Sequence, residues 1–269
     1  MTDSLYIATT DAYSGKSLVS LGIVELLLRR TSRVGVFRPV IGARSLRERD
    51  KNIDLLLSHF DLSTPYQNTY GMLMNEAVDL IGRGRYDDVL DRIIGKYKAL
   101  DGCCDFILCI GSDLESETVA LEFDFNADIA KNLSSPVLLV ANGAGREVAV
   151  IVNSCRTTLD AFQERGAQVL GMIVNRAELT DLHKVRAALK QELEDEKVML
   201  SVIPAHTTLS SPTLREVAEQ LDARILFGAE HLDWLAERPL VIAMQLDNYL
   251  SHLSENALLI TAGDRSDVI

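Results

Sequence analysis

The sequence predicts a doubly wound α/β fold, a mostly parallel sheet with helices on both faces, followed by a small, partial α/β domain. Two observations predict the larger fold. Short apolar runs rich in Val and Ile alternate with longer amphipathic segments, which is the pattern of a parallel sheet with crossover helices. Turn residues or helix caps bound the runs, as Gly15 and Ser17 do after the first and Asn175 and Arg176 do after the fifth. In such folds, ligands bind at the carboxyl ends of the strands.

The strands and helices of the larger part follow from this alternation in chain order. Each expected strand is a short, mostly apolar run, and the six runs are Leu5–Ala8, Val34–Arg38, Phe106–Ile110, Val137–Ala141, Val169–Asn175 and Val198–Ile203. The segments between them are long enough for the crossover helices that parallel strands require. The seven expected helices are Lys16–Arg30, Ile53–Phe60, Tyr86–Leu100, Asn126–Leu133, Glu147–Arg165, Asp181–Glu194 and Thr213–Leu221.

After Gly228 the pattern restarts on a smaller scale. This predicts a first domain over residues 1–228, and a linker with the beginning of a second domain over 229–269. In the second part, Arg238–Met244 is expected as a strand, Gln245–Leu253 as a helix and Leu258–Thr261 as another strand. The last strand has no crossover helix to cover it before the chain stops. We therefore expect a larger protein cut within its second domain, and a frayed tail over Gly263–Ile269 is the alternative.

The charge balance disfavours several classes of partner. The 269 residues carry a net charge of −12 and the sequence pI is about 4.9, so nucleic acid or an anionic membrane would be repelled. The N-terminus has no basic region followed by an apolar run, and no segment reaches the roughly 18 apolar residues of a membrane span. We expect a cytoplasmic chain whose partners are small metabolites and proteins. Its four cysteines are expected as core residues in a reducing compartment.

A candidate phosphate loop lies between the first strand and the first helix. Gly15, Lys16 and Ser17 supply the glycine, the cation and the hydroxyl that such a loop uses for its turn, the phosphates and a magnesium ion. Thr10 replaces the leading glycine, and a β-branched residue there would restrict any left-handed dihedral angles of the turn. The alternative is an ordinary helix start with Ser14 or Ser17 near the cap. The pattern leaves open whether the loop still binds a nucleotide.

The acid that would hold a magnesium ion is not at its usual place. A carboxylate at the end of a neighbouring strand normally holds this ion in a hydrolysing enzyme, yet the strand that ends at Ile110 has no acid before its glycine. Asp113 lies beyond it in a loop and could serve. Asp11 could join a water-mediated metal shell or be a turn residue. The plainer interpretation is that the metal site has been lost, which leaves Ser17 as a weak magnesium ligand.

Two polar residues at strand ends complete the expected pocket. Arg38 ends the second strand, where a cation can hold a carboxylate or a phosphate. Asn175 ends the fifth strand, where an amide can read a base edge. A solvated or paired charge is an equal alternative for Arg38, and a helix cap is an equal alternative for Asn175. We group Arg38 with Asp113 as a pocket for an anion or a substrate.

Taken together, these motifs resemble the dethiobiotin synthetase fold, which is of the P-loop NTPase type. The loop "TTDAYSGKS" resembles that family's glycine-threonine-aspartate start leading to Gly-Lys-Thr, "VFRPV" its lysine-proline strand end, "LCIGSD" its glutamate-glycine turn and "MIVNRAEL" its asparagine-bearing adenine strand. The sequence departs from the family at positions that take part in the reaction, namely Thr9 or Thr10, Arg38 and Ile110. These departures disfavour an ATP-dependent carboxylation. The resemblance implies these nucleotide-binding residues: Thr10, Asp11, Ser14, Gly15, Lys16, Ser17, Asn175 and Pro204.

The closer resemblance is to the N-terminal portion of the long bacterial phosphate acetyltransferases. Those proteins join a dethiobiotin-synthetase-like domain to a small domain named for its Asp-Arg-Thr-Gly-Gly motif, and then to a catalytic domain. Here "SLVSLGIVELLLR" is similar to the first helix, "SVIPAH" to the sixth strand and "LLITAGDRSDVI" to the entry of the small domain, with Asp264, Arg265 and Asp267 as its core. The resemblance runs over essentially the whole chain.

This resemblance implies that the complete protein transfers an acetyl group between coenzyme A and phosphate, with coenzyme A bound only by a catalytic domain that this chain lacks. The present portion would be non-catalytic, with a degenerate pocket for ATP and magnesium, another nucleotide or a small-molecule effector. Its surfaces would contact the catalytic domain and build a homo-oligomer. The competing hypotheses are a stand-alone ATP-dependent synthetase of the dethiobiotin or cobyrinic acid type, and a scaffold whose pocket binds nothing. Substitution of Lys16 should abolish the activity of a ligase and have little catalytic effect in a regulatory portion.

Overall fold

The computed structural model describes residues 2–11, 13–42, 49–112, 119–245, 248 and 250–265. Its contacts divide the chain into two compact units, Met1–Pro204 and Ala205–Ile269. The division falls earlier in the chain than Gly228, where the sequence pattern restarts. We call the two parts unit 1 and unit 2.

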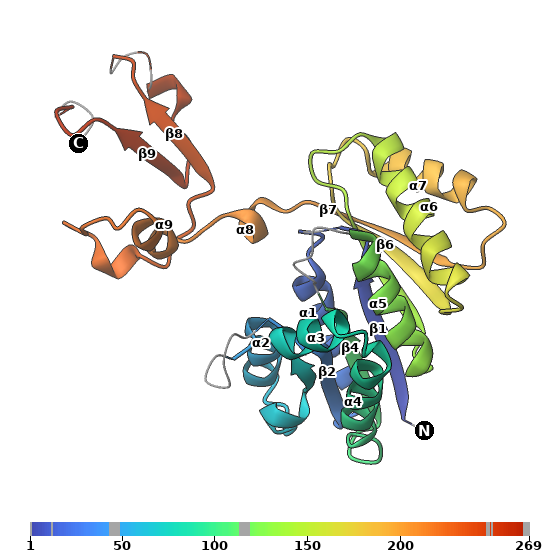
Figure 1. Cartoon of the computed structure of the whole chain (residues 1–269). Coiled ribbons are helices and arrows are strands. Elements are labelled where there is room, and N and C mark those ends of the chain that lie inside the picture. The colour runs from blue at the N-terminus through green and yellow to red at the C-terminus, as the bar shows by residue number, and fades with distance from the viewer. Residues whose placement is uncertain are drawn as a thin grey trace. The chain divides into compact units, whose positions relative to one another are not determined.

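Unit 1 is built on a seven-stranded parallel sheet (Figure 1). The spatial order is β3-β2-β4-β1-β5-β6-β7, and every pairing is parallel. The six strands expected from the sequence are confirmed, and so is the α/β class. Because β1 lies between β4 and β5, the loops that follow these three strands meet at one edge of the sheet. The strands are β1 (Asp3–Thr9), β2 (Val34–Ile41), β3 (Tyr70–Leu73), β4 (Phe106–Ile110), β5 (Val137–Asn142), β6 (Val169–Ala177) and β7 (Met199–Pro204).

The sequence does not predict β3 or the helix that follows it. The strand is four residues long and runs directly into α3 (Met74–Gly82), so its apolar residues merge with those of the helix and show no separate period. Gly71 allows β3 to lie close to its neighbours. A Cβ atom there would be 2.5 Å from the carbonyl oxygen of Pro39 and 2.9 Å from Cγ1 of Ile93. β3 thereby forms the edge of the sheet next to β2.

Helices cover both faces of this sheet, as Figure 1 shows. Ile7 of β1 packs with apolar residues of α1 and α2 on one face, and its neighbours Tyr6 and Ala8 pack with α3 to α7 on the other. This alternation follows from the two-residue period of a strand. Six of the expected helices are confirmed in unit 1, and α5 begins earlier than expected. The helices besides α3 are α1 (Lys16–Leu28), α2 (Lys51–His59), α4 (Tyr86–Lys98), α5 (Val119–Asn132), α6 (Val148–Glu164) and α7 (Leu182–Glu192), with the 3-10 turn η1 (Tyr66–Asn68).

Unit 2 holds short helices and a two-stranded parallel sheet. Thr213 caps α9 through a capping box with Glu216, and the amide of Leu214 donates to the carbonyl of Trp234 over 2.9 Å. This bond ties the segment before Gly228 to unit 2, which explains why the division falls earlier. The elements are α8 (Thr207–Ser210), α9 (Leu214–Gln220), the 3-10 turns η2 (Ala229–His231) and η3 (Leu250–His252), and the strands β8 (Arg238–Ile242) and β9 (Ala257–Thr261).

One expectation for unit 2 is corrected, because the strand expected over Arg238–Met244 ends at Ile242. Within the helix expected over Gln245–Leu253, Asn248 is helical and the 3-10 turn η3 covers Leu250–His252, and residues 246, 247 and 249 lie outside the described part. Among the helices that the structure describes, none combines the length and the apolar character needed to cross a membrane.

Candidate functional site

The candidate phosphate loop joins the carboxyl end of β1 to the start of α1. Gly15 immediately precedes the helix in a left-handed conformation with φ of 81°, which glycine adopts without strain. Among the described residues no side chain caps α1, so neither Ser14 nor Ser17 acts as the cap of an ordinary helix start. The first amide groups of α1 are therefore left without a side-chain acceptor.

Thr10 does not adopt the left-handed conformation that its side chain disfavours. The residue is buried, and its amide donates to the carbonyl of Val140 on β5 over 3.1 Å. The positive φ angles of the loop's described residues are at Tyr13, with 58°, and at Gly15. Thr10 thus continues the ladder between β1 and β5, and the turn is made further along the loop. The loss of the leading glycine does not by itself block the loop.

Lys16 points towards the end of β4. Its side chain is buried, and its Nζ donates to the carbonyl oxygen of Gly111 over 2.7 Å. Gly111 directly follows β4, which lies beside β1 in the sheet. The lysine therefore bridges two of the loops that meet at the carboxyl edge. A phosphate in the loop would compete with a neutral carbonyl for this ammonium group.

The hydroxyl of Ser17 is held by the start of α2. It donates to Oδ1 of Asn52, and the amide of Asn52 donates to Oδ1 of Asp50 over 3.0 Å. Asp50 is the N-cap of α2. The loop and the beginning of α2 are thus linked by side-chain contacts, a link that the sequence spacing does not indicate.

Arg38 does not end its strand as expected, because β2 continues to Ile41. It is buried within β2 and forms an ion pair. Its Nη1 lies 2.5 Å from Oδ2 of Asp50, and the two side chains are only 6% and 8% exposed. The amide of Asp50 donates to the hydroxyl of Tyr66 over 2.6 Å, and burial raises the pKa of that hydroxyl. Because a buried cation facing a buried carboxylate is already compensated, an added anion would have to compete with Asp50. Asp113, expected beside Arg38, lies outside the described residues.

The described end of β4 offers no carboxylate. Ile110 is fully buried in the core, and Ser112 follows it by two residues. The hydroxyl of Ser112 donates to the carbonyl of Val40 over 3.0 Å and accepts from its amide over 2.8 Å. Asn126 of α5 accepts from the amide of Ser112 and donates to its carbonyl, both over 3.0 Å. The sequence does not single out Ser112 and Asn126 as site residues, because α5 carries other polar residues such as Asp124 and nothing marks Asn126 among them.

Asp11 forms an ion pair with Arg146, a residue that the sequence motifs do not indicate. Its Oδ2 accepts from the Thr10 hydroxyl and from Nη1 of Arg146, each over 2.8 Å. Its Oδ1 is buried and has no hydrogen-bond partner among the described residues. Arg146 comes from the loop between β5 and α6, which reads "NGAGR". Glycines between a strand and a helix were the signal that could have identified this second loop.

Asn175 and Arg176, at the end of β6, hold the backbone of the phosphate loop. Nδ2 of Asn175 donates to the carbonyl of Ser14 over 2.9 Å, and Nη1 of Arg176 donates to the carbonyl of Tyr13, also over 2.9 Å. Asn175 is buried, and a Cβ atom at Gly15 would lie 2.3 Å from its Nδ2. Asn175 therefore does not cap a helix. It packs against the loop, and its Nδ2 uses one of its two N–H groups for the bond to Ser14.

The structure gathers most of the predicted residues around one loop. Pro204 instead ends β7, where it pairs with Ala177 at the end of β6. One connection from Arg38 to the loop runs through Asp50 and Asn52 to Ser17. The residues brought together are Thr10, Asp11, Ser14, Gly15, Lys16, Ser17 and Asn175.

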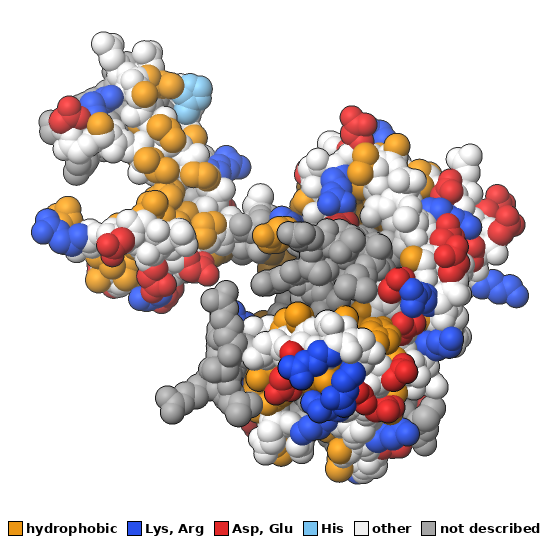
Figure 2. All heavy atoms as spheres, viewed as in Figure 1, with side chains coloured by type: hydrophobic (Ala, Val, Ile, Leu, Met, Phe, Trp, Pro, Cys, Tyr) orange, Lys and Arg blue, Asp and Glu red, His pale blue; other side chains and the backbone are white. Residues whose placement is uncertain are grey.

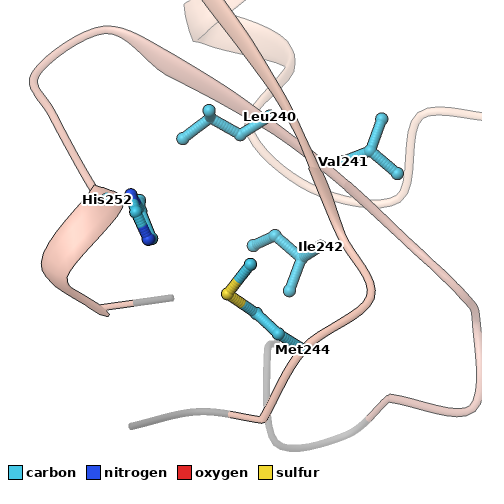
Figure 3. A pocket seen from close by; sticks show the side chains of 5 residues that line it. All are labelled: Leu240, Val241, Ile242, Met244 and His252. Atoms are coloured by element: carbon cyan, nitrogen blue, oxygen red, sulfur yellow. The ribbon is translucent and has the colours of Figure 1, made fainter. Parts of the chain in front are cut away.

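Unit 2 has a pocket of its own, with a volume of about 230 Å³. Figure 3 shows the ring of His252 on one side of it, with Ile242 and Met244 facing that ring. Leu240 and Val241 complete the lining. One imidazole among aliphatic side chains gives too few polar groups to orient a charged metabolite. Within the described part of the chain, no group of three or more His, Cys, Asp or Glu side chains could hold a metal ion.

Two protein families match the chain. The family described as AAA domain matches residues 3–213, and the DRTGG domain matches residues 216–269. Curated relatives include a phosphate acetyltransferase of Nitratidesulfovibrio vulgaris, 39% identical over 272 residues, and one of Synechocystis sp., 43% identical over 270 residues. Both matches cover 100% of this chain, which spans 39% of the length of these relatives. The order of modules expected from the sequence is confirmed.

Solved structures are similar at a lower level. A Cyanothece McdA variant in complex with ATP has a TM-score of 0.49 and 13% identity, over 84% of this chain and 99% of that protein. The MinD cell division protein of Aquifex aeolicus has a TM-score of 0.46 and 16% identity, over 78% of this chain and 84% of that protein. Likeness at this level carries no conclusion about function.

Proposed function

We propose, from the premise that the chain belongs to the AAA domain family and carries a DRTGG domain, that it is the regulatory and assembly portion of a phosphate acetyltransferase. The observation that carries the proposal is the match along the whole chain with relatives of that name, of which it spans 39%. The rest of such a protein would bind coenzyme A and transfer the acetyl group to phosphate. The present portion would contact that catalytic part and build the oligomer.

The ligand that the loop fits is a nucleotide polyphosphate. Gly15 turns the backbone so that the uncapped amides at the start of α1 are available to an anion. Lys16 lies in the same loop with its ammonium group on the neutral carbonyl of Gly111. A charge-assisted bond to a phosphate is stronger than a bond to such a carbonyl. A bound nucleotide would therefore draw Lys16 away from β4, which is the local change that a regulatory signal requires.

Turnover of the nucleotide does not belong to this proposal. A hydrolytic site needs a carboxylate at a strand end to hold magnesium, and Ile110 is the core residue in that position. The described oxygen ligands around the loop include the hydroxyl of Ser17 and Oδ1 of Asp11, and the described end of β4 adds no carboxylate to them. This donor set does not fit a hydrolytic magnesium site. The nucleotide would bind as an effector and leave unchanged.

Asn175 is the residue of this site whose side chain could meet the base of such a nucleotide. Its Nδ2 donates one of two N–H groups to the carbonyl of Ser14, and the second N–H and Oδ1 can donate to and accept from a base edge. An amide that both donates and accepts favours no single base.

Acetyl phosphate formation by the longer polypeptide, measured with and without ATP, tests the regulatory role. We expect ATP to change kcat or KM in the wild type and to have no effect in Lys16→Ala. The matched control is Lys184→Ala, which removes a surface lysine of α7 that pairs with Asp181 and should keep the response to ATP. A rate that is independent of ATP in the wild type, under conditions where ATP binds, would contradict the regulatory role.

One observation favours a second function, that of a stand-alone ATP-dependent synthetase. The sequence Gly15-Lys16-Ser17 is intact and lies between β1 and α1, as such an enzyme requires. A synthetase would release ADP when supplied with its acceptor substrate, and Lys16→Ala would abolish that release. We expect no ADP release above background from the chain with ATP, magnesium and a diamino acid of the dethiobiotin precursor type.

A further inference from the structure

The strands of unit 2 have the composition of strands that are covered on both faces. β8 reads "RPLVI" and β9 reads "ALLIT", so both are nearly continuous apolar runs. They pair in parallel, with Val241 opposite Ile260 and Pro239 opposite Leu258. Parallel strands of this kind occur in folded proteins with helices over both faces, and two strands alone are at best marginally stable.

The β8–β9 pair exposes apolar side chains at one end of one face. Pro239, Val241, Leu258 and Ile260 share a face because alternate residues of a strand point the same way. Val217 of α9 lines a cavity together with Pro239 and Leu258, but Val241 is 74% exposed and Ile260 is 46% exposed. We call these four strand residues the β8–β9 face.

The opposite face is better covered. Ile242 is buried there, and it lines the pocket of Figure 3 together with Leu240 and His252 of η3, a pocket that Val241 also borders. Figure 2 shows hydrophobic side chains gathered over this part of the chain. The exposed apolar surface of the β8–β9 face lies on strands whose composition is typical of strands covered on both faces. It therefore indicates a covering partner that is not among the described residues.

We propose that an amphipathic helix of the longer polypeptide docks on the β8–β9 face. This inference rests on the proposed function, in which the chain is one portion of a phosphate acetyltransferase. More than half of each curated relative lies outside the segment that matches this chain, which leaves ample sequence for a covering helix. A helix is the element that covers the face of a parallel sheet.

A second copy of the chain fits this face less well. Residues 205–269 contain ten Asp and Glu residues against four Lys and Arg residues, so two copies of unit 2 would approach each other with like net charge. A helix of the same polypeptide also docks without the entropy cost of bringing two molecules together.

Thiol labelling of Val241→Cys tests the proposal. The background is Cys103→Ser, because Cys103 is the exposed cysteine among the four. In the 269-residue chain we expect the new thiol to react as fast as that of the control Glu230→Cys, whose parent side chain is 72% exposed. In the longer polypeptide we expect the thiol at residue 241 to react about ten-fold or more slowly, while the control reacts at an unchanged rate.

Each other outcome overturns the proposal. Equal labelling of residue 241 in both polypeptides would mean that nothing covers the face. Protection already in the 269-residue chain would assign the face to a second copy if it grew with protein concentration, and to unit 1 of the same chain if it did not. Slower labelling of the Glu230→Cys control as well would show general burial of unit 2 rather than docking on this face.

A second variant guards against a cysteine that disturbs the fold. Val241→Asp should lower the Tm of the longer polypeptide, because the charge would be buried under the helix, and should leave the Tm of the 269-residue chain unchanged. Acetyl transfer by the same longer polypeptide is assayed separately. Protection of the thiol at residue 241 without acetyl transfer would overturn the proposed function and keep the docking helix. Acetyl transfer without protection of this thiol would keep the proposed function and overturn the docking helix.

Discussion

Gly15→Ala places a methyl group where the phosphate loop has no room for it. The new Cβ atom would lie 2.3 Å from Nδ2 of Asn175 on a backbone with φ of 81°. The left-handed conformation costs a residue other than glycine about 1–2 kcal/mol. Displacing the Asn175 amide breaks its buried hydrogen bond to Ser14 and adds about 1–3 kcal/mol. We expect Gly15→Ala to lower the free energy of unfolding of unit 1 by about 2–5 kcal/mol.

Urea unfolding followed by far-UV circular dichroism measures this loss as a lower midpoint at an unchanged slope. Gly22→Ala is the matched control, because Gly22 lies inside α1 and a Cβ atom there meets nothing within 4 Å. The control should be stabilised by up to about 1 kcal/mol.

A double-mutant cycle separates the two contributions to this loss. Combined with Asn175→Ala, Gly15→Ala should cost only its dihedral term, about 1–2 kcal/mol, because the clashing amide is gone. A loss below about 1 kcal/mol for Gly15→Ala alone, or single losses that add in full in the double variant, would refute the packing described for the loop.

Three further predictions concern charges and thiols. Arg38→Met leaves the Asp50 carboxylate buried without its cation and should cost about 3–5 kcal/mol in urea unfolding; adding Asp50→Asn should recover part of this loss, and no recovery would contradict the pair. The Arg33 guanidinium lowers the pKa of Asp105 to about 2. The Asp105 carboxylate therefore stabilises the fold above its pKa in the unfolded chain, near 4, and this stabilisation is lost as the pH falls towards 2. Between about pH 4 and pH 2 the Tm should fall less in Asp105→Asn than in the wild type, and identical profiles would contradict the lowered pKa. Burial raises the pKa of the Cys155 thiol to about 12. The neutral thiol therefore makes its full contribution to the free energy of unfolding below about pH 8.5 and loses it as the pH rises towards 12. The fall in Tm at alkaline pH should be smaller in Cys155→Ala, and an unchanged fall would count against the burial of the thiol.

The sequence predicts much of the sheet because buried parallel strands carry a strong compositional signal. The strands that contain Val36, Leu108 and Val140 are mostly apolar and are found where the alternation indicates. β3 has only four residues and merges with the apolar face of α3, so no period marks it. Short edge elements of this kind are set by tertiary packing, as the close contact of Gly71 with Pro39 shows.

The candidate site is less predictable, because partners distant in sequence decide what each residue does. Lys16 and Gly15 follow from the motif, but the motif does not say that Asp50 pairs with Arg38 or that Arg146 pairs with Asp11. The concern that Thr10 would strain the loop assumes that the turn lies at that residue. The structure places the positive φ angles at later residues of the loop, which only the backbone path can reveal.

Calorimetric titration of ATP into the chain and into its Lys16→Ala variant tests the central claim most directly. ATP should bind the wild type with one-to-one stoichiometry and leave unhydrolysed, and Lys16→Ala should lose most of the heat signal. Absence of ATP binding to the wild type would contradict the account and would assign the loop a purely structural role.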